Sequence, residues 1–150
     1  MSMLTDDLDA IHSQAAELLR DGGHRYTAAR RRIVAALIGA EGPITIPQLL
    51  TIADHLVQSS TYRNLSVLEE AGVVARVITR EDHARYELDE RLTRHHHHLI
   101  CTDCGEVLDF ELSPSLEASL DQELQRAGQA VMFRIEHHRL DLLGTCMGCS

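Results

Sequence analysis

The sequence predicts an α+β protein of two modules, a helical module closed by a β-hairpin and a second, α/β module. Three observations support this prediction. Apolar residues recur at helical spacing up to residue 71. Two β-rich runs, "VVARVIT" and "ARYEL", flank the polar stretch "REDH" and read as a hairpin. The second half alternates strand-like runs with one helical run and contains all four cysteines.

Four helices and the hairpin make the first module a winged helix, which we assign to residues 1–88. The first helix covers about residues 4–19, and the fourth is "STYRNLSVLEEAG", capped by Ser59 or Ser60. Thr27 and Thr45 are expected to cap the second and third helices. The other expected boundary residues are Gly22, Gly23, Gly39, Pro47 in the first turn of the third helix, and Gly72.

A polar segment precedes the second module. Residues 89–94 are expected to form a hinge, and residues 95–150 the α/β domain. Its expected elements are strands at 95–101 and 106–110, a helix from Pro114 to Ala127 and a long strand at 131–146. Ser113 should cap the helix and Gly128 should end it.

Charge is distributed unevenly along the chain, whose formal net charge is −9. Residues 20–80 contain eight Arg and five acidic residues, and residues 81–150 contain six Arg and fourteen acidic residues. This asymmetry indicates anion binding in the first half and cation binding in the second, or simply solvated surface charge. No apolar run approaches the length of a membrane span, and the acidic start does not resemble a signal peptide, so we expect a cytoplasmic protein without membrane contact.

The cysteines form two Cys-x-x-Cys pairs, Cys101 with Cys104 and Cys146 with Cys149. This spacing lets both sulfurs of a pair reach one ion, and four thiolates complete a tetrahedral zinc shell. A closed shell has no open position, so we predict structural rather than catalytic zinc. A redox Cys-x-x-Cys pair or disulfides are the alternatives.

Four consecutive histidines, His95 to His98, run directly into the first cysteine pair. In a strand, successive side chains point to opposite faces, so His95 and His97 share one face and His96 and His98 share the other. The run therefore contributes to two separate metal sites. Mixed imidazole and carboxylate ligation suits Fe(II), Mn(II), Ni(II), Co(II) or Zn(II). The candidate further ligands are Glu87, Asp109, Glu117, His137 and His138. The alternative is a solvated histidine run without a metal role.

In their order along the chain, "STYRNLSVLEEAGVV", "HHHHLICTDCG" and "HHRLDLLGTCMGC" resemble the ferric uptake regulator family of bacterial metal-sensing repressors, over about residues 24–149. The resemblance implies a DNA-binding winged helix and a C-terminal dimerisation domain. It implies a non-enzymatic regulator whose metal-loaded homodimer binds AT-rich inverted repeats. Such a regulator represses genes of metal uptake, and iron is the metal expected first. Members that sense zinc, manganese, nickel or peroxide are the alternatives within the family; a metal buffer or a metalloenzyme is the alternative outside it.

The resemblance also implies specific residues. It assigns structural Zn²⁺ to the four cysteines and a regulatory ion, Fe²⁺ or Zn²⁺ before Mn²⁺ or Ni²⁺, to two sensor sites. The site within the dimerisation domain comprises His95, His97, Glu117 and His138, and the hinge site comprises Glu87, His96, His98 and Asp109. Many members add a hinge ligand from the winged helix, often a histidine near the turn before the third helix. That turn here reads "AEGPITIP" and has no histidine. Glu41, His55 or His83 are the possible substitutes, unless the site has no such ligand.

DNA contacts are expected from the fourth helix, as the recognition helix, and from the start of the second. The residues expected to contact double-stranded DNA are Arg25, Thr27, Arg30, Ser60, Thr61, Tyr62, Arg63 and Asn64. Metal at the hinge site would then hold the two recognition helices of a dimer at the spacing of successive major grooves.

Overall fold

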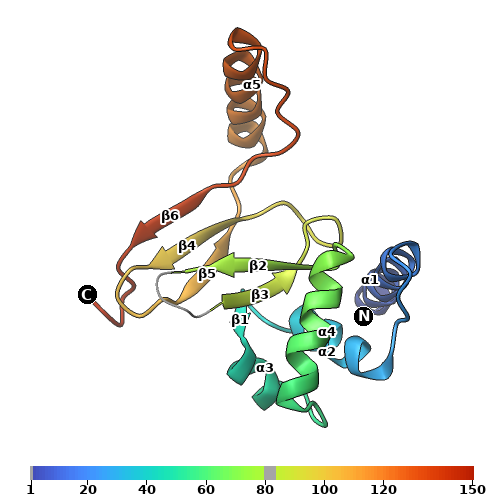
Figure 1. Ribbon diagram of the computed structural model, residues 1–150. Helices are drawn as coiled ribbons and strands as arrows, with labels where there is room; N and C mark the ends of the chain where they lie inside the picture. The colour runs from blue at the N-terminus through green and yellow to red at the C-terminus, as the bar shows by residue number, and fades with distance from the viewer. Residues whose placement is uncertain (1, 80–83) are drawn as a thin grey trace. The chain divides into compact units, whose positions relative to one another are not determined.

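Two units, residues 1–94 and 95–150, make up the chain in the computed structural model (Figure 1). The structure describes residues 2–79 and 84–150, with side chains from residue 7 onward. The predicted hairpin turn at residues 80–83, with His83, lies outside the described residues. The role of residues 89–94 as a hinge stays a prediction. Within the described chain, no helix is both long and apolar enough to cross a membrane.

The first unit contains four helices: α1 (Ser2–Asp21), α2 (Ala28–Ile38), α3 (Ile46–Ile52) and α4 (Gln58–Glu70). Two predicted caps are confirmed, since the Thr27 side chain accepts a hydrogen bond from the Arg30 N–H and that of Thr45 from the Gln48 N–H. The Gln48 side chain in turn accepts from the Thr45 backbone, which completes a capping box. Gly72 follows α4 with a φ of +76°, a left-handed conformation that favours glycine.

The prediction that Ser59 or Ser60 caps α4 is wrong. The N-cap is Val57, which has no side-chain cap hydrogen bond. The hydroxyls of Ser60 and Thr61 both donate to the Val57 carbonyl, at 3.0 and 2.8 Å, so they lie inside the first turn. Thr61 is 0% exposed, and the helix begins at Gln58, before both serines.

The sheet of the first unit has the strand order β1-β3-β2, with antiparallel pairing throughout. The predicted hairpin corresponds to β2 (Val74–Ile78) and β3 (Ala84–Leu88), which pair along their whole length. The two-residue β1 (Ile44–Thr45) was not predicted, because two residues are too few to show a strand period. All residues of the main apolar cluster belong to this unit, among them Leu19, Ile33, Leu65, Leu68 and Val74.

The second unit contains β4 (His97–Cys101), β5 (Val107–Phe110), α5 (Pro114–Ala130) and β6 (Asp141–Gly144). The strand order is β5-β4-β6, with β5 antiparallel and β6 parallel to the central strand. Ser113 caps α5 as predicted, accepting from the Leu116 N–H. Figure 1 shows α5 extending away from this sheet.

Several boundaries of the second unit differ from prediction. Strand β4 begins at His97 rather than at residue 95, and β5 begins at Val107 rather than at residue 106. Helix α5 continues past Gly128 to Ala130. Gly128 serves close packing instead: a Cβ there would lie 2.6 Å from the Phe133 carbonyl oxygen of the returning chain. The predicted long strand at 131–146 is reduced to β6, because β4 offers only His98 to Cys101 as parallel partners.

Candidate functional site

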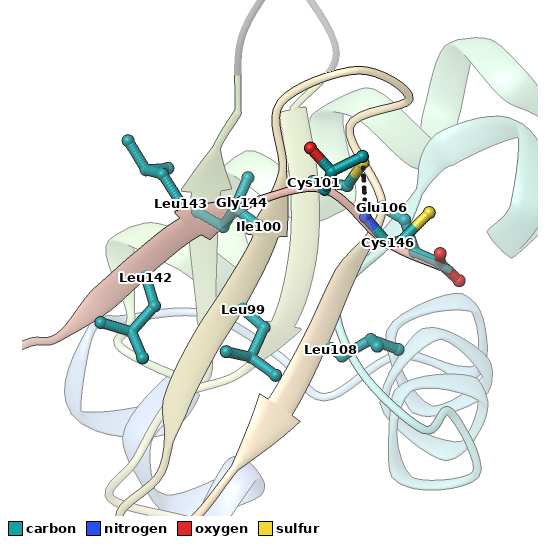
Figure 2. Close-up of a pocket in the computed structure, with 10 residues that line it drawn as sticks. Leu99, Ile100, Cys101, Glu106, Leu108, Leu142, Leu143, Gly144 and Cys146 are labelled. Atoms are coloured by element: carbon teal, nitrogen blue, oxygen red, sulfur yellow. Dashed lines mark hydrogen bonds between the residues drawn. The ribbon is translucent and has the colours of Figure 1, made fainter. Parts of the chain in front are cut away.

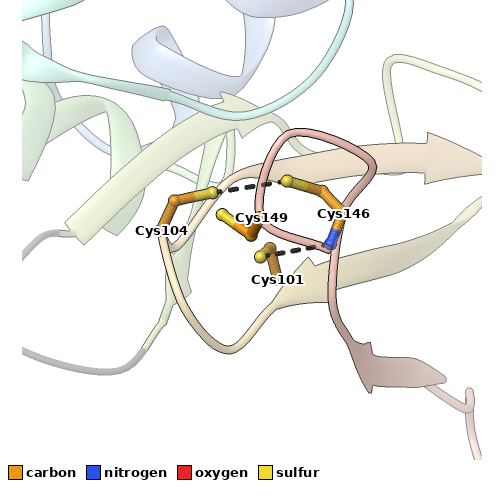
Figure 3. Close-up of side chains that lie close together, drawn as sticks. All are labelled: Cys101, Cys104, Cys146 and Cys149. Atoms are coloured by element: carbon orange, nitrogen blue, oxygen red, sulfur yellow. Dashed lines mark hydrogen bonds between the residues drawn. The ribbon is translucent and has the colours of Figure 1, made fainter.

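The four cysteines meet where the turn after β4 lies beside the end of the chain (Figure 3). All four are free thiols, with their Sγ atoms within 4.8 Å of one another. The Sγ atoms of Cys104 and Cys146 are 3.7 Å apart. A tetrahedral zinc ion with Zn–S bonds of about 2.3 Å requires sulfurs about 3.8 Å apart. The cluster therefore fits structural Zn²⁺, as the spacing of the two pairs predicted.

Backbone dipoles already favour a thiolate in this cluster. N–H groups of Cys104 and Cys146 point at the sulfur of Cys101 and lower its pKa to about 6. By contrast, hydrogen bonding with Cys146 and the other thiols raises the pKa of Cys149 to about 12. One thiol is thus ionised at neutral pH while another retains its proton, so zinc binding should release protons.

The first histidine cluster gathers around the carboxylate of Glu117, on the first turn of α5. Its Oε1 lies 3.1 Å from Nε2 of His95 and 2.7 Å from Nε2 of His138, and its Oε2 lies 3.1 Å from Nε2 of His97. The four residues are those predicted for the dimer-domain site. His137 is exposed and belongs to none of the three candidate clusters formed by the described residues.

The contacts around Glu117 suit a cation better than they suit hydrogen bonding. Nε2 atoms of His95 and His138 face each other at 3.2 Å. Among the described residues, the buried Oε1 of Glu117 has no aligned hydrogen-bond partner, although two ring nitrogens are within 3.1 Å. A hydrogen bond from His97, with the charges of the three imidazoles when protonated, lowers the pKa of Glu117. An ionised carboxylate and three converging imidazoles fit a divalent metal.

The second histidine cluster lies around Asp109 on β5. Nε2 of His96 is 3.9 Å from Asp109 Oδ2, and Nε2 of His98 is 3.8 Å from Oδ1. Strand register explains this arrangement, because His98 pairs directly with Asp109. The fourth predicted ligand, Glu87, lies on β3 in the first unit. Glu41 and His55, the possible substitutes, are exposed residues of that unit.

The predicted recognition helix, α4, presents its first half to solvent. Tyr62 is 53% exposed, Arg63 and Ser60 are exposed, and Leu65 and Leu68 on the opposite side enter the core. The Arg30 guanidinium donates to the Asn64 side-chain oxygen at 3.1 Å and to the Arg25 carbonyl at 2.6 Å. These contacts bring the predicted DNA-contacting residues of α2 and α4 together.

Thr61 requires a correction. It was predicted to contact DNA, but its side chain is completely buried and its hydroxyl donates to the Val57 carbonyl. Thr27 has a second role, because its side chain caps α2. Thr61 is therefore a structural residue of α4.

Two acidic residues beside the clusters were missed. Asp121 Oδ1 lies 3.0 Å from Nδ1 of His138, and Asp141 Oδ1 lies 3.1 Å from Nδ1 of His98. Asp121 follows Glu117 by four residues, so helical spacing could have predicted that both carboxylates lie on the same face of the helix. Asp141 depends on the register between β4 and β6, which no local pattern indicates.

Comparisons with known proteins agree with this geometry. The family model described as "Ferric uptake regulator family" matches residues 21–143. The peroxide operon regulator of Bacillus subtilis (strain 168) is 28% identical over 141 residues, covering 91% of this chain and 92% of that protein.

Two solved structures are also similar. The ferric uptake regulator of Helicobacter pylori superposes with a TM-score of 0.72 at 20% identity, covering 95% of this chain and 93% of that one. A zinc-bound manganese uptake regulator superposes with a TM-score of 0.62 at 32% identity, covering 89% of this chain and 98% of that one.

The winged helix, the four-thiol cluster and the paired histidine clusters now have one explanation. The resemblance stated from the motifs is confirmed by a family match over most of the chain. The chain belongs to the ferric uptake regulator family of metal-responsive transcriptional repressors.

Proposed function

We propose that the chain is a cytoplasmic repressor without enzymatic activity that binds an AT-rich inverted repeat as a metal-loaded homodimer and controls genes of metal homeostasis. The observation that carries this proposal is the division of four consecutive histidines between two clusters of possible metal ligands, in a chain that also contains a winged helix. A metal buffer needs no exposed recognition helix. A metalloenzyme needs an open coordination position beside a general base, and the four-thiol cluster is a closed shell.

DNA recognition is assigned to the exposed half of α4. Tyr62 and Arg63 would enter the major groove, where an Arg reaches a guanine edge or a phosphate and a ring packs on thymine methyls. Ser60 and the start of α2, with Arg25, Thr27 and Arg30, would contact the backbone. The hydrogen bond between Arg30 and Asn64 supports a single surface formed from both helices.

Replacing Arg63 with alanine should weaken operator binding without changing the fold or the zinc content. The exposed guanidinium has no role in the core, and loss of one base contact costs about 1–3 kcal/mol, roughly 5- to 150-fold per half-site. The measurement is a gel-shift titration on an AT-rich palindrome, with added metal and with chelator.

The matched control is Arg126→Ala, which makes the same charge change on exposed α5. Its partner is Glu123, and exposed pairs contribute little to stability. Operator affinity equal to that of the parent in the Arg63 variant would refute the recognition helix. Failure of the parent protein to bind any DNA, with or without metal, would favour a metal buffer.

Homodimer formation is assigned to an apolar face of the second unit. Leu99 on β4 pairs with Leu108 on β5 and with Leu142 on β6, so the three side chains form one row across the sheet (Figure 2). They are 40%, 46% and 43% exposed, and Leu116 and Phe133 add further exposed apolar surface. A row of half-exposed leucines is the type of surface that a second copy of the chain would cover.

Leu99→Asp is expected to convert the dimer to a monomer. Burial of a leucine contributes about 1.5–3 kcal/mol, and placing a carboxylate in the same interface adds a desolvation cost. The dimer dissociation constant should therefore rise at least roughly a hundredfold. Sedimentation equilibrium measures this change. Ile78→Asp, at an exposed strand position of the first unit, should remain dimeric; dimerisation of the Leu99 variant at parental affinity would contradict the assignment.

The regulatory site at the hinge is assigned to Glu87, His96, His98 and Asp109. These residues would hold a divalent cation, for which they supply two carboxylates and two imidazoles as ligands. Neutral imidazoles are needed for ligation, so metal-dependent repression should weaken as pH falls through the histidine range. Fe²⁺ and Zn²⁺ are the first candidates, followed by Mn²⁺ and Ni²⁺.

Peroxide sensing is the second candidate function. Several relatives are named peroxide-responsive repressors, and that of Bacillus subtilis is named a peroxide operon regulator. Asp109 provides a carboxylate beside His96 and His98, which agrees with the Asp that the peroxide-sensing branch carries at sensor positions. Loss of operator binding after treatment of the Fe²⁺-loaded protein with peroxide, but not of the Mn²⁺-loaded protein, would support it.

A further inference from the structure

Two carboxylates outside the proposed ligand sets each contact the far side of one metal-binding imidazole. In the Asp109 cluster, Nε2 of His98 faces Asp109 while Nδ1 lies 3.1 Å from Asp141 Oδ1. In the Glu117 cluster, Nε2 of His138 faces Glu117 at 2.7 Å while Nδ1 lies 3.0 Å from Asp121 Oδ1. In each cluster, one ring therefore has its Nε2 toward the carboxylate of the proposed site and its Nδ1 toward a carboxylate outside it.

We propose that Asp141 and Asp121 are positioning residues that hold His98 and His138 in the tautomer and orientation required for metal binding through Nε2. The proposal rests on the two sensor sites proposed above and extends them beyond their ligands. An ionised carboxylate only accepts hydrogen bonds, so Asp141 requires Nδ1–H on His98 and leaves the lone pair of that neutral ring on Nε2. His138 lies between the carboxylates of Glu117 and Asp121, so Asp121 selects Nδ1–H when a cation takes the place of the proton at Nε2.

The position of Asp141 follows from the sheet. His98 and Asp141 are direct partners in the parallel pairing of β4 and β6. Side chains of paired residues project from the same face of a sheet, so this register brings the carboxylate to the ring. Arg139 supports the carboxylate, with its Nε 3.2 Å from Oδ2 and 3.4 Å from Oδ1 of Asp141. Asp141 is thus held between a guanidinium and the imidazole.

The position of Asp121 follows from the helix. Glu117 and Asp121 are four residues apart on α5, so their side chains lie on the same face. His138 is placed against this face, with one ring nitrogen toward each carboxylate. The helix therefore presents a ligand and a positioning group to the two edges of a single ring.

A carboxylate at Nδ1 fixes the ring and raises the basicity of the ligating nitrogen. Loss of such a partner typically costs about 10- to 100-fold in metal affinity. We therefore expect Asp141→Leu to weaken metal binding at His98 by this factor and to leave the Glu117 cluster unchanged. Asp121→Leu should have the reverse selectivity. Asp141→Asn and Asp121→Asn retain an acceptor oxygen and should restore most of the affinity.

The test uses the full-length dimer with structural zinc bound at the four-thiol cluster. The first readout is the tautomer of His98 in protein free of sensor metal, from long-range ¹H–¹⁵N spectra at a pH where the imidazole is neutral. The parent should show Nδ1–H. Asp141→Leu should shift His98 toward Nε2–H, and Asp121→Leu should leave it unchanged. The second readout, for both rings, is a Zn²⁺ titration against a competing chelator, followed by the ring signals of His98 and His138.

The outcomes separate this inference from the proposed sites. An unchanged His98 tautomer in Asp141→Leu, or a changed tautomer with parental Zn²⁺ affinity, overturns the positioning role of Asp141. Parental Zn²⁺ affinity at His138 in Asp121→Leu overturns that of Asp121. If the His98 and His138 signals of the parent do not respond to Zn²⁺ at all, the sensor sites themselves are wrong and the inference falls with them.

Discussion

Replacing Cys149 with serine is expected to unfold the second unit while the first unit stays folded. Cys149 is exposed, so the substitution leaves no cavity and acts through the loss of one thiolate of the four-thiol cluster. Structural zinc contributes about 10–16 kcal/mol of apparent binding free energy in small domains, comparable with the whole stability of a typical domain. The buried apolar residues of the second unit are few, chiefly Ile100, Cys101 and Val107, so little else stabilises it.

The measurements are zinc content, thermal unfolding and hydrogen exchange. We expect zinc to leave the variant on dialysis against chelator, and the amides of β4 to β6 to lose protection. The amides of β2 and β3 should stay protected, because the main apolar cluster lies entirely within residues 1–94. Met147→Ser is the matched control, since it puts the same residue at a 92% exposed, non-ligand position of the same turn. Full zinc retention and native exchange in the Cys149 variant would show that the thiols are not a zinc site.

The combined His96→Ala and His98→Ala variant is expected to lose the dependence of DNA binding on metal. These histidines are the two imidazoles of the Asp109 cluster, and without them Glu87 and Asp109 offer too few ligands to bind a cation tightly. Metal acts by binding one arrangement of the recognition helices more tightly than another, and such coupling is typically about 1–3 kcal/mol, or 5- to 150-fold in affinity. The variant should show nearly the same weak operator affinity with metal and with chelator.

Two checks make this result specific. Structural zinc and dimer mass should match the parent, which shows that removal of the buried His98 ring has not unfolded the second unit. His137→Ala, an exposed histidine outside the clusters, should respond to metal like the parent. A fully metal-responsive double variant would move regulation to the Glu117 cluster, and the corresponding His95→Ala and His97→Ala variant would then be the one to lose it.

Local chemistry explains where the sequence predictions succeeded. Thr27, Thr45 and Ser113 were predicted as helix caps and all three accept the expected backbone hydrogen bond. A cap depends on residues within one turn, so the sequence contains all the information it needs. The errors occurred where tertiary packing competes with a local signal. Ser59 and Ser60 do not cap α4, because the helix begins at Gln58 and includes both serines in its first turn, beside the buried Thr61.

Taken by itself, the sequence determined the chemistry of this protein. Two Cys-x-x-Cys pairs specify a four-thiol cluster, and four histidines in an extended run must face alternate sides. The tertiary structure decided which distant carboxylates meet those rings. Asp141 lies 43 residues from His98 in the chain and reaches it only through the parallel register of β4 and β6. That register is set by how the whole sheet pairs and packs, whereas alternation along a strand follows from the backbone of each residue alone.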